Sequence, residues 1–205
     1  MTDRKAEILQ AAADLLQTRS FTSFSYQDLS QRLGITKASI HHHFATKEEL
    51  GVALVERFRA GQKAMLAEID RVHDDRPLDR LEAFLQQSLG MTDSDPEKIC
   101  PGGAVQSEIN VVPERMAREL GEMIREGRAW LTGVLAQGRG KGDLHFAGTA
   151  EDQAALIMAS LQGGLQNARA ESRALMEAIV RQLRGGMAME TTPYLSVDST
   201  TPQPT

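Results

Sequence analysis

The sequence predicts an all-α protein, on three observations. Aromatic residues make up only 4% of the chain, and its common residues, among them Ala, Leu, Gln, Arg and Glu, favour helices. The chain lacks runs of the alternating apolar and polar residues that are typical of strands. Apolar residues instead recur at helical spacing between residues that cap helices. With 205 residues, 41% of them hydrophobic, the chain is long enough to bury a substantial core.

The first 50 residues predict a domain of three helices. An apolar stripe over residues 8–16 indicates the first helix. Ser25 and Asp28 have the spacing of a capping box, which opens a short second helix, and Gly34 is placed to end it. Thr36 is placed to cap the third helix.

The second and third of these helices form a predicted helix-turn-helix. A tight turn at Gly34 and Ile35 joins them, which is the arrangement that holds a second helix outward, in position to enter the major groove of DNA. Ile35, Ile40 and Phe44 fall on the inward side of the third helix. The side facing outward is expected to carry Lys37, Ala38, His41 and His42.

This helix-turn-helix resembles the DNA-binding segment of TetR-type bacterial transcriptional repressors. The resemblance covers residues 25–50, which read SYQDLSQRLGITKASIHHHFATKEEL. It includes an aromatic residue at Phe44 and a helix start of the form Lys-Glu-x-Leu at Lys47. The chain departs from the family in having His41 and His43 where Tyr is usual, and Ala38 where Gly is common.

The resemblance implies a set of DNA contacts. Those that face bases or nearby phosphates are Thr36, Lys37, Ala38, Ser39 and His41. Those that hold the phosphate backbone are Ser25, His42 and Lys47. The hydroxyl of Ser25 fits a purely capping role equally well.

Residues 51–187 predict a larger helical domain. Thr46 and Glu49 form a capping box that opens a long helix to about Val72. Further helices are expected over residues 78–90, 104–110, 113–138, 154–168 and 171–183. Residues 188–205 are rich in Thr, Ser and Pro and predict a disordered tail. The resemblance implies that the larger domain binds a small effector and forms a dimer.

Several residues of this domain are candidates for an effector pocket. Methionine adapts to varied ligands, and the residues expected to line a pocket are Met91, Cys100, Met116, Met123 and Trp130. The alternative is that these side chains simply fill the core. Cys100 precedes a predicted helix, whose N-terminal dipole favours a reactive thiolate. Residues 100–110 are also similar to a stretch of some family members that respond to electrophiles or oxidants, whereas the alternative is a thiol that only packs.

Small residues predict where two subunits meet. Gly and Ala let helices approach closely, and the expected contact is a four-helix interface that includes Ala155, Ala159, Gly163, Leu175 and Ile179. The alternative is an ordinary buried helix within one subunit.

The composition also argues against several classes of protein. A formal net charge of −5 argues against coating nucleic acid by bulk positive charge. A single cysteine excludes an internal disulfide and a zinc site of several cysteines, and consecutive histidines on a helix point about 100° apart, so no metal site is expected there. We find no catalytic motif, cofactor motif, signal core or apolar run of membrane-spanning length, so a cytoplasmic protein is expected.

The prediction is therefore a homodimeric regulator that binds a palindromic DNA operator and releases it when a small effector binds. The alternative from another class is a helical carrier of small molecules without a DNA role. The sequence contains no signal that separates a repressor from an activator.

Overall fold

The computed structural model of the chain describes residues 3–92 and 98–187, and all regular structure within those ranges is helical. The all-α prediction is therefore confirmed for the described part of the chain. Its helices are α1 (Arg4–Arg19), α2 (Tyr26–Leu33), α3 (Lys37–His43), α4 (Lys47–His73), α5 (Pro77–Gly90), α6 (Pro101–Gln106), α7 (Glu114–Lys141), α8 (Ala150–Ala170) and α9 (Arg173–Gly185). The tail predicted over residues 188–205 lies outside the described residues.

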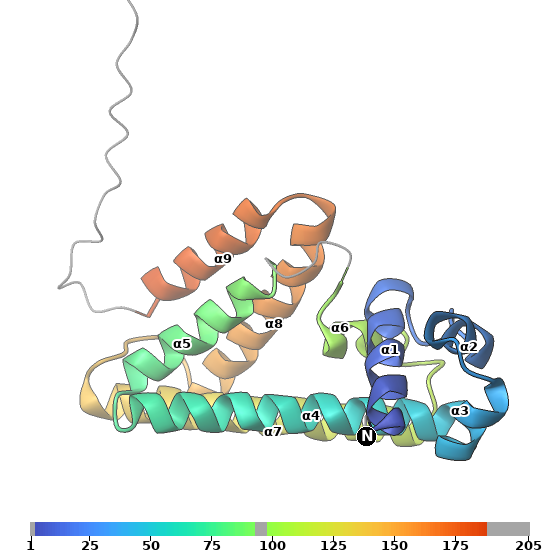
Figure 1. The fold of residues 1–205 in the computed structure, drawn as a ribbon. Coiled ribbons are helices and arrows are strands. Elements are labelled where there is room, and N and C mark those ends of the chain that lie inside the picture. The colour runs from blue at the N-terminus through green and yellow to red at the C-terminus, as the bar shows by residue number, and fades with distance from the viewer. Residues whose placement is uncertain (1–2, 93–97, 188–205) are drawn as a thin grey trace, which may run out of the picture.

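Two long helices, α4 and α7, run side by side along the molecule (Figure 1). Helices α1–α3 gather at one end of this pair, and α5, α8 and α9 lie over the other end. The short helix α6 lies beside α1, between the two groups. We call α1–α3 with the start of α4 the head, and the remainder the body.

Local capping explains where most helices begin. Asp3 accepts a hydrogen bond from the backbone N–H of Lys5 at 3.0 Å and so caps α1. Thr149 and Asp152 form a reciprocal capping box that opens α8. Such side chains satisfy backbone N–H groups that have no partner inside the helix.

Several helix starts differ from the sequence prediction, among them α8, which begins at Ala150 and not at residue 154, and two helices that begin at or just after a proline. Helix α6 begins at Pro101, earlier than the expected residue 104, because the proline ring is preset for the first helical turn, where a backbone N–H is not needed. Helix α7 begins at Glu114, and Pro113 precedes the helix in an extended conformation instead of opening it.

The head and the body share an apolar core at their junction. One buried cluster runs from Ile8 through the head to Val55 and continues into α6 and the start of α7, where it includes Ala104 and Leu120. A second cluster joins α5, α7, α8 and α9. The predicted domain boundary at residue 50 falls inside α4. The apolar core of the head extends past this boundary to Val55.

Salt bridges join α4 to α7. The guanidinium of Arg59 on α4 donates to Glu119 at 2.8 Å and to Glu126 at 2.5 Å, and both carboxylates lie on α7. The hydrogen bonds from Arg59 lower the pKa of Glu126 to about 2. The long pair is thus held together by polar contacts near its middle as well as by the core.

None of the helices in residues 3–92 and 98–187 has the length and apolar character needed to cross a membrane.

Candidate DNA-binding surface and effector cavities

Local hydrogen bonds fix the turn between α2 and α3. Ser25 and Asp28 form the predicted capping box at the start of α2, with the backbone N–H of Ser25 donating to Asp28 at 2.8 Å. Gly34 has φ +64°, a left-handed conformation that glycine adopts without steric cost. Thr36 then accepts from the backbone N–H of Ser39 at 3.2 Å and caps α3.

Helix α3 has the predicted orientation. Ile40 has no exposed surface and Phe44 is buried, while Ile35 is half-buried against the same core. The residues exposed on the opposite side are Thr36, Lys37, Ala38, His41 and His42, and Ser39 is half-buried. The structure therefore presents short and hydrogen-bonding side chains outward along a helix that is fixed at both ends.

Tyr26 holds the C-terminal end of α3 in place. Its buried hydroxyl donates to the carbonyl of Phe44 at 2.9 Å. The ring of His41 lies edge-on to the ring of Tyr26 at 4.7 Å between centroids, and its Nδ1 is 3.1 Å from the carbonyl oxygen of Ala45. With Nδ1 directed at the protein, Nε2 is the ring nitrogen that remains for an outside partner.

Lys47 does not take the outward position that its predicted phosphate contact requires. Its ammonium donates to the carbonyl of Phe24 and lies 4.8 Å from the ring centroids of both Phe21 and Phe24. Burial lowers the pKa of this ammonium. Two aromatic rings and a carbonyl thus hold the cation against the head in the absence of DNA, and the phosphate contact of Lys47 stays a prediction.

Ser25 is exposed, and its hydroxyl is engaged within the protein. Its Oγ accepts from the backbone N–H of Gln27 at 3.2 Å and donates to Asp28 at 2.6 Å. The capping role is therefore confirmed, and its phosphate contact stays a prediction.

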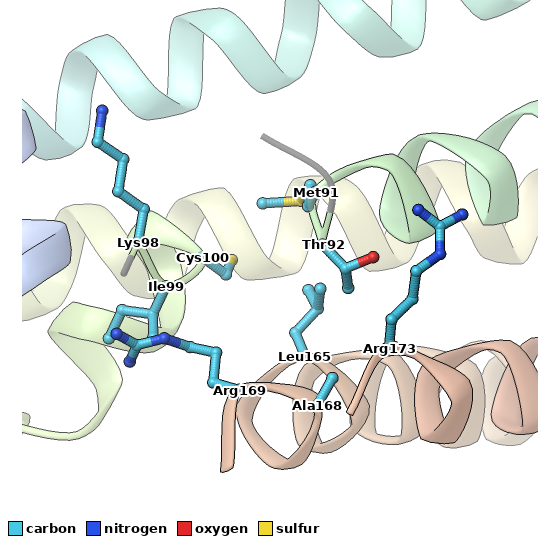
Figure 2. A pocket seen from close by; sticks show the side chains of 9 residues that line it. All are labelled: Met91, Thr92, Lys98, Ile99, Cys100, Leu165, Ala168, Arg169 and Arg173. Carbon is cyan, nitrogen blue, oxygen red and sulfur yellow. The ribbon is translucent and has the colours of Figure 1, made fainter. Parts of the chain in front are cut away.

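Two cavities of the body meet at Cys100. The first, which we call the arginine cavity, has a volume of about 230 Å³ and lies between the end of α5, the segment before α6, and α8 and α9. Figure 2 shows its lining residues: Met91, Thr92, Lys98, Ile99, Cys100, Leu165, Ala168, Arg169 and Arg173. Lys98 points away from the others in this view, and its ammonium contacts Asp14 on α1 at 2.8 Å.

The second cavity, which we call the glutamine cavity, has a volume of about 340 Å³ and lies between α4, α6, α7 and α8. Its lining residues are Gln62, Cys100, Gly102, Gln106, Met123, Ile124, Arg128, Ala155, Met158, Ala159 and Gln162. Cys100 thus borders both cavities, and Met123 borders the second.

Two predicted pocket residues lie elsewhere. Met116 is wholly buried in the core of the head, where its sulfur packs over Gly51. The indole N–H of Trp130 donates to the carboxylate of Asp70 at 3.0 Å, and its ring packs against Phe84. Neither residue lines the two cavities, and their place in an effector pocket stays a prediction. The positions of Met116 and Trp130 along their helix do not by themselves reveal these contacts.

The structure favours the second of the two interpretations of Cys100, a thiol that packs. Hydrogen bonds from the backbone N–H groups of Gly103 and Gly102 do favour the thiolate, as expected at a helix start. Burial has the larger effect and raises the pKa of the thiol above its usual value. The thiol form is therefore favoured at neutral pH.

Two family models cover most of the chain. The model of the N-terminal domain of "Bacterial regulatory proteins, tetR family" matches residues 8–54, and that of the "Tetracyclin repressor-like, C-terminal domain" matches residues 77–183. The chain belongs to the TetR family of bacterial regulatory proteins. It is therefore a DNA-binding transcriptional regulator, in a family that is not enzymatic.

Individual relatives agree with this assignment. The repressor NemR of Escherichia coli is 27% identical over 165 residues, which are 77% of this chain and 79% of that protein. The nucleoid occlusion factor SlmA of Vibrio campbellii is 28% identical over 137 residues, covering 61% of this chain and 68% of that protein.

Solved structures extend the likeness across both domains. A TetR-family regulator from Agrobacterium tumefaciens has 35% identity and a TM-score of 0.86, covering 90% of this chain and 97% of its own. The crystal structure of the reduced form of Escherichia coli NemR has 25% identity and a TM-score of 0.81, covering 93% and 100%.

This TetR-family chain has a contact between body and head that its sequence does not reveal. The backbone N–H of Ile99 donates to the carbonyl of Gln17 on α1 at 3.2 Å, and the amide of Gln17 donates back to the carbonyl of Ile99 at 2.9 Å. Beyond α6, Glu108 accepts from the backbone N–H of Phe21 at 2.5 Å and of Thr22 at 3.2 Å. We call residues 98–108 the clasp, because both of its ends hold the head.

Proposed function

We propose that the protein is a homodimeric repressor of the cytoplasm, in which two α3 helices bind the halves of a palindromic operator. The outward face of α3 carries this proposal, because its exposed residues are short or hydrogen-bonding and its backbone is fixed by Thr36 and Tyr26. Such a helix reads base edges in the major groove, while a two-fold dimer places its partner about one helical turn away. We assign base or phosphate contacts to Thr36, Lys37, Ala38, Ser39, His41 and His42.

A groove between α8 and α9 supports the proposal of a dimer. It is lined mainly by small and apolar residues, including Ala159, Gly163 and Ile179, and Leu156 beside them is 56% exposed. A Cβ atom added at Gly163 meets no described atom within 4 Å beyond its own helix backbone. An open strip of this kind suits close packing against the same strip of a second copy.

Two other predicted interface residues, Ala155 and Leu175, do not line this groove. Ala155 is exposed on α8 and borders the glutamine cavity, while Leu175 is half-buried on α9. We keep both as candidates at the edge of the contact, with Gly163 at its centre.

The clasp supports release of DNA by an effector. Cys100 and Gly102 line the glutamine cavity, and the same segment is hydrogen-bonded to α1 and to the turn before α2. A ligand that moves α6 would therefore move the head with it, and the spacing of the two α3 helices would no longer fit successive grooves.

The proposal is tested by a gel shift on duplex DNA that flanks the gene of this protein. We expect a complex with two subunits per site that forms at nanomolar protein in moderate salt and survives an excess of unrelated DNA. A protein that binds this DNA no better than unrelated DNA would favour the rival function, a carrier of small molecules.

A further inference from the structure

The glutamine cavity holds two buried polar atoms without partners. They are Oε1 of Gln62 on α4 and Nε2 of Gln162 on α8, and neither has a hydrogen-bond partner among the residues that the structure describes. Both side chains line the cavity. One atom is an acceptor and the other a donor, so the pair offers complementary sites to one molecule placed between them.

Two glycines make room for these amides. A Cβ atom added at Gly103 on α6 would collide with Nε2 of Gln162. A Cβ atom added at Gly127 on α7 would lie 3.0 Å from Nε2 of Gln62, which is tighter than ordinary contact. The backbone of each neighbouring helix therefore lacks a side chain where a glutamine head group sits, which leaves space for both amides.

The rest of the lining is mostly apolar. Met123, Ile124 and Met158 surround the amides with hydrocarbon and thioether surface, and Ala155 and Ala159 add small side chains. The described lining contains no carboxylate, and its guanidinium, on Arg128, belongs to an exposed residue. A cation in such a site would lose its hydration without gaining an opposite charge, and an anion would find an opposite charge only at the exposed Arg128.

We propose that the glutamine cavity binds a small uncharged molecule that carries both a hydrogen-bond acceptor and a hydrogen-bond donor on an apolar frame. This inference rests on the proposed function, since it names the class of effector for the same regulator. The acceptor of the ligand faces Nε2 of Gln162, and its donor faces Oε1 of Gln62. A volume of about 340 Å³ suits a molecule at the small end of the range for ligand pockets.

The test uses three probes of the same shape, titrated into the full-length protein by calorimetry without DNA. They are 2-naphthamide, which has both hydrogen-bonding groups and no charge, 2-naphthoate, which is an anion, and 2-methylnaphthalene, which has neither group. We expect 2-naphthamide to bind at least tenfold more tightly than either of the others, since one good hydrogen bond corresponds to about a tenfold change in affinity.

Two variants locate the binding. Gln162→Leu removes the donor and should weaken 2-naphthamide about tenfold, while 2-methylnaphthalene binds at least as well as before. Gly103→Ala keeps the glutamine and displaces its amide, so it should weaken 2-naphthamide in the same direction. Gln86→Leu, at an exposed position on α5, is the matched control and should leave all three affinities unchanged.

The inference is overturned if the anion or the hydrocarbon binds most tightly, if no probe binds, or if Gln162→Leu binds 2-naphthamide as the unaltered protein does. Because the titrations contain no DNA, their result stands apart from the gel shift. The protein could bind 2-naphthamide selectively and still bind its flanking DNA no better than unrelated DNA. That result would support the proposed ligand class and contradict the proposal that the protein is a repressor.

Discussion

Glu108, in the turn that follows α6, accepts a hydrogen bond from the backbone N–H of Phe21 at 2.5 Å, although the two residues are 87 positions apart. Phe21 lies in the turn between α1 and α2, where no helix supplies a partner for this N–H. A side chain of the body therefore satisfies a backbone group of the head, and this hydrogen bond joins the two parts.

The first prediction follows from this contact. Glu108→Ala leaves the N–H groups of Phe21 and Thr22 without their carboxylate partner, and the free energy of unfolding should fall by about 1–3 kcal/mol. Glu108→Gln keeps one acceptor and should cost less. Urea unfolding measures both, and Glu114→Ala, at a side chain that is 93% exposed, is the control. Equal stability of all three variants would show that the contact does not support the head.

The second prediction concerns Lys47. Lys47→Ala removes a cation over two rings and a hydrogen bond to Phe24, so the free energy of unfolding should fall by about 1–2 kcal/mol. The salt dependence of DNA binding should keep its slope, because Lys47 is not on the outward face. If the slope of the salt dependence fell by about one unit while the stability stayed unchanged, the result would support the phosphate contact that the sequence predicts for Lys47.

The third prediction separates two adjacent glycines of α8. Gly163 faces open space, whereas a Cβ at Gly164 would lie 2.8 Å from the sulfur of Met176 on α9. Gly163→Arg should therefore give a folded monomer by light scattering and circular dichroism. Gly164→Ala should instead lower the stability of each subunit by about 1–3 kcal/mol through overpacking. A dimeric Gly163→Arg protein would place the subunit contact elsewhere.

The fourth prediction concerns the pH dependence of Cys100 alkylation. Burial raises the pKa of this thiol, so at pH 7–8 its thiolate fraction is below that of an ordinary cysteine and alkylation should be slow. The rate with iodoacetamide should keep rising with pH above about 8.5, where a free cysteine reaches half-ionisation. A rate that levels off below pH 8 would indicate a lowered pKa and would support sensing of electrophiles through Cys100.

The parts of the fold that depend on neighbours in the sequence were predicted closely. The bounds of α2 and α3 follow from Ser25, Gly34 and Thr36, because caps and a left-handed glycine act within a few residues. The orientation of α3 follows from the spacing of Ile40 and Phe44.

Contacts between distant segments were the ones that the sequence did not reveal. Met116 and Met123 both lie on α7 and belong to the same buried cluster, yet only Met123 also borders one of the two cavities. Lys47 and Glu108 have the side chains of surface residues, and only the folded chain brings aromatic rings and free N–H groups to them. Nothing in the sequence indicates that Gln62 and Gln162 line a cavity. The glycines beside them, Gly103 and Gly127, are unusual inside helices.

The most direct test of the account is the effect of Lys37→Ala on operator binding. Lys37 is exposed at the start of α3, and we expect its loss to weaken binding to the flanking DNA by about 1–3 kcal/mol in fluorescence anisotropy. Lys63→Ala removes an equal charge from α4, where Lys63 pairs with Glu126 on α7, and should leave the affinity unchanged. Equal affinities of the Lys37→Ala, Lys63→Ala and unaltered proteins would contradict the assignment of α3 as the helix that binds DNA.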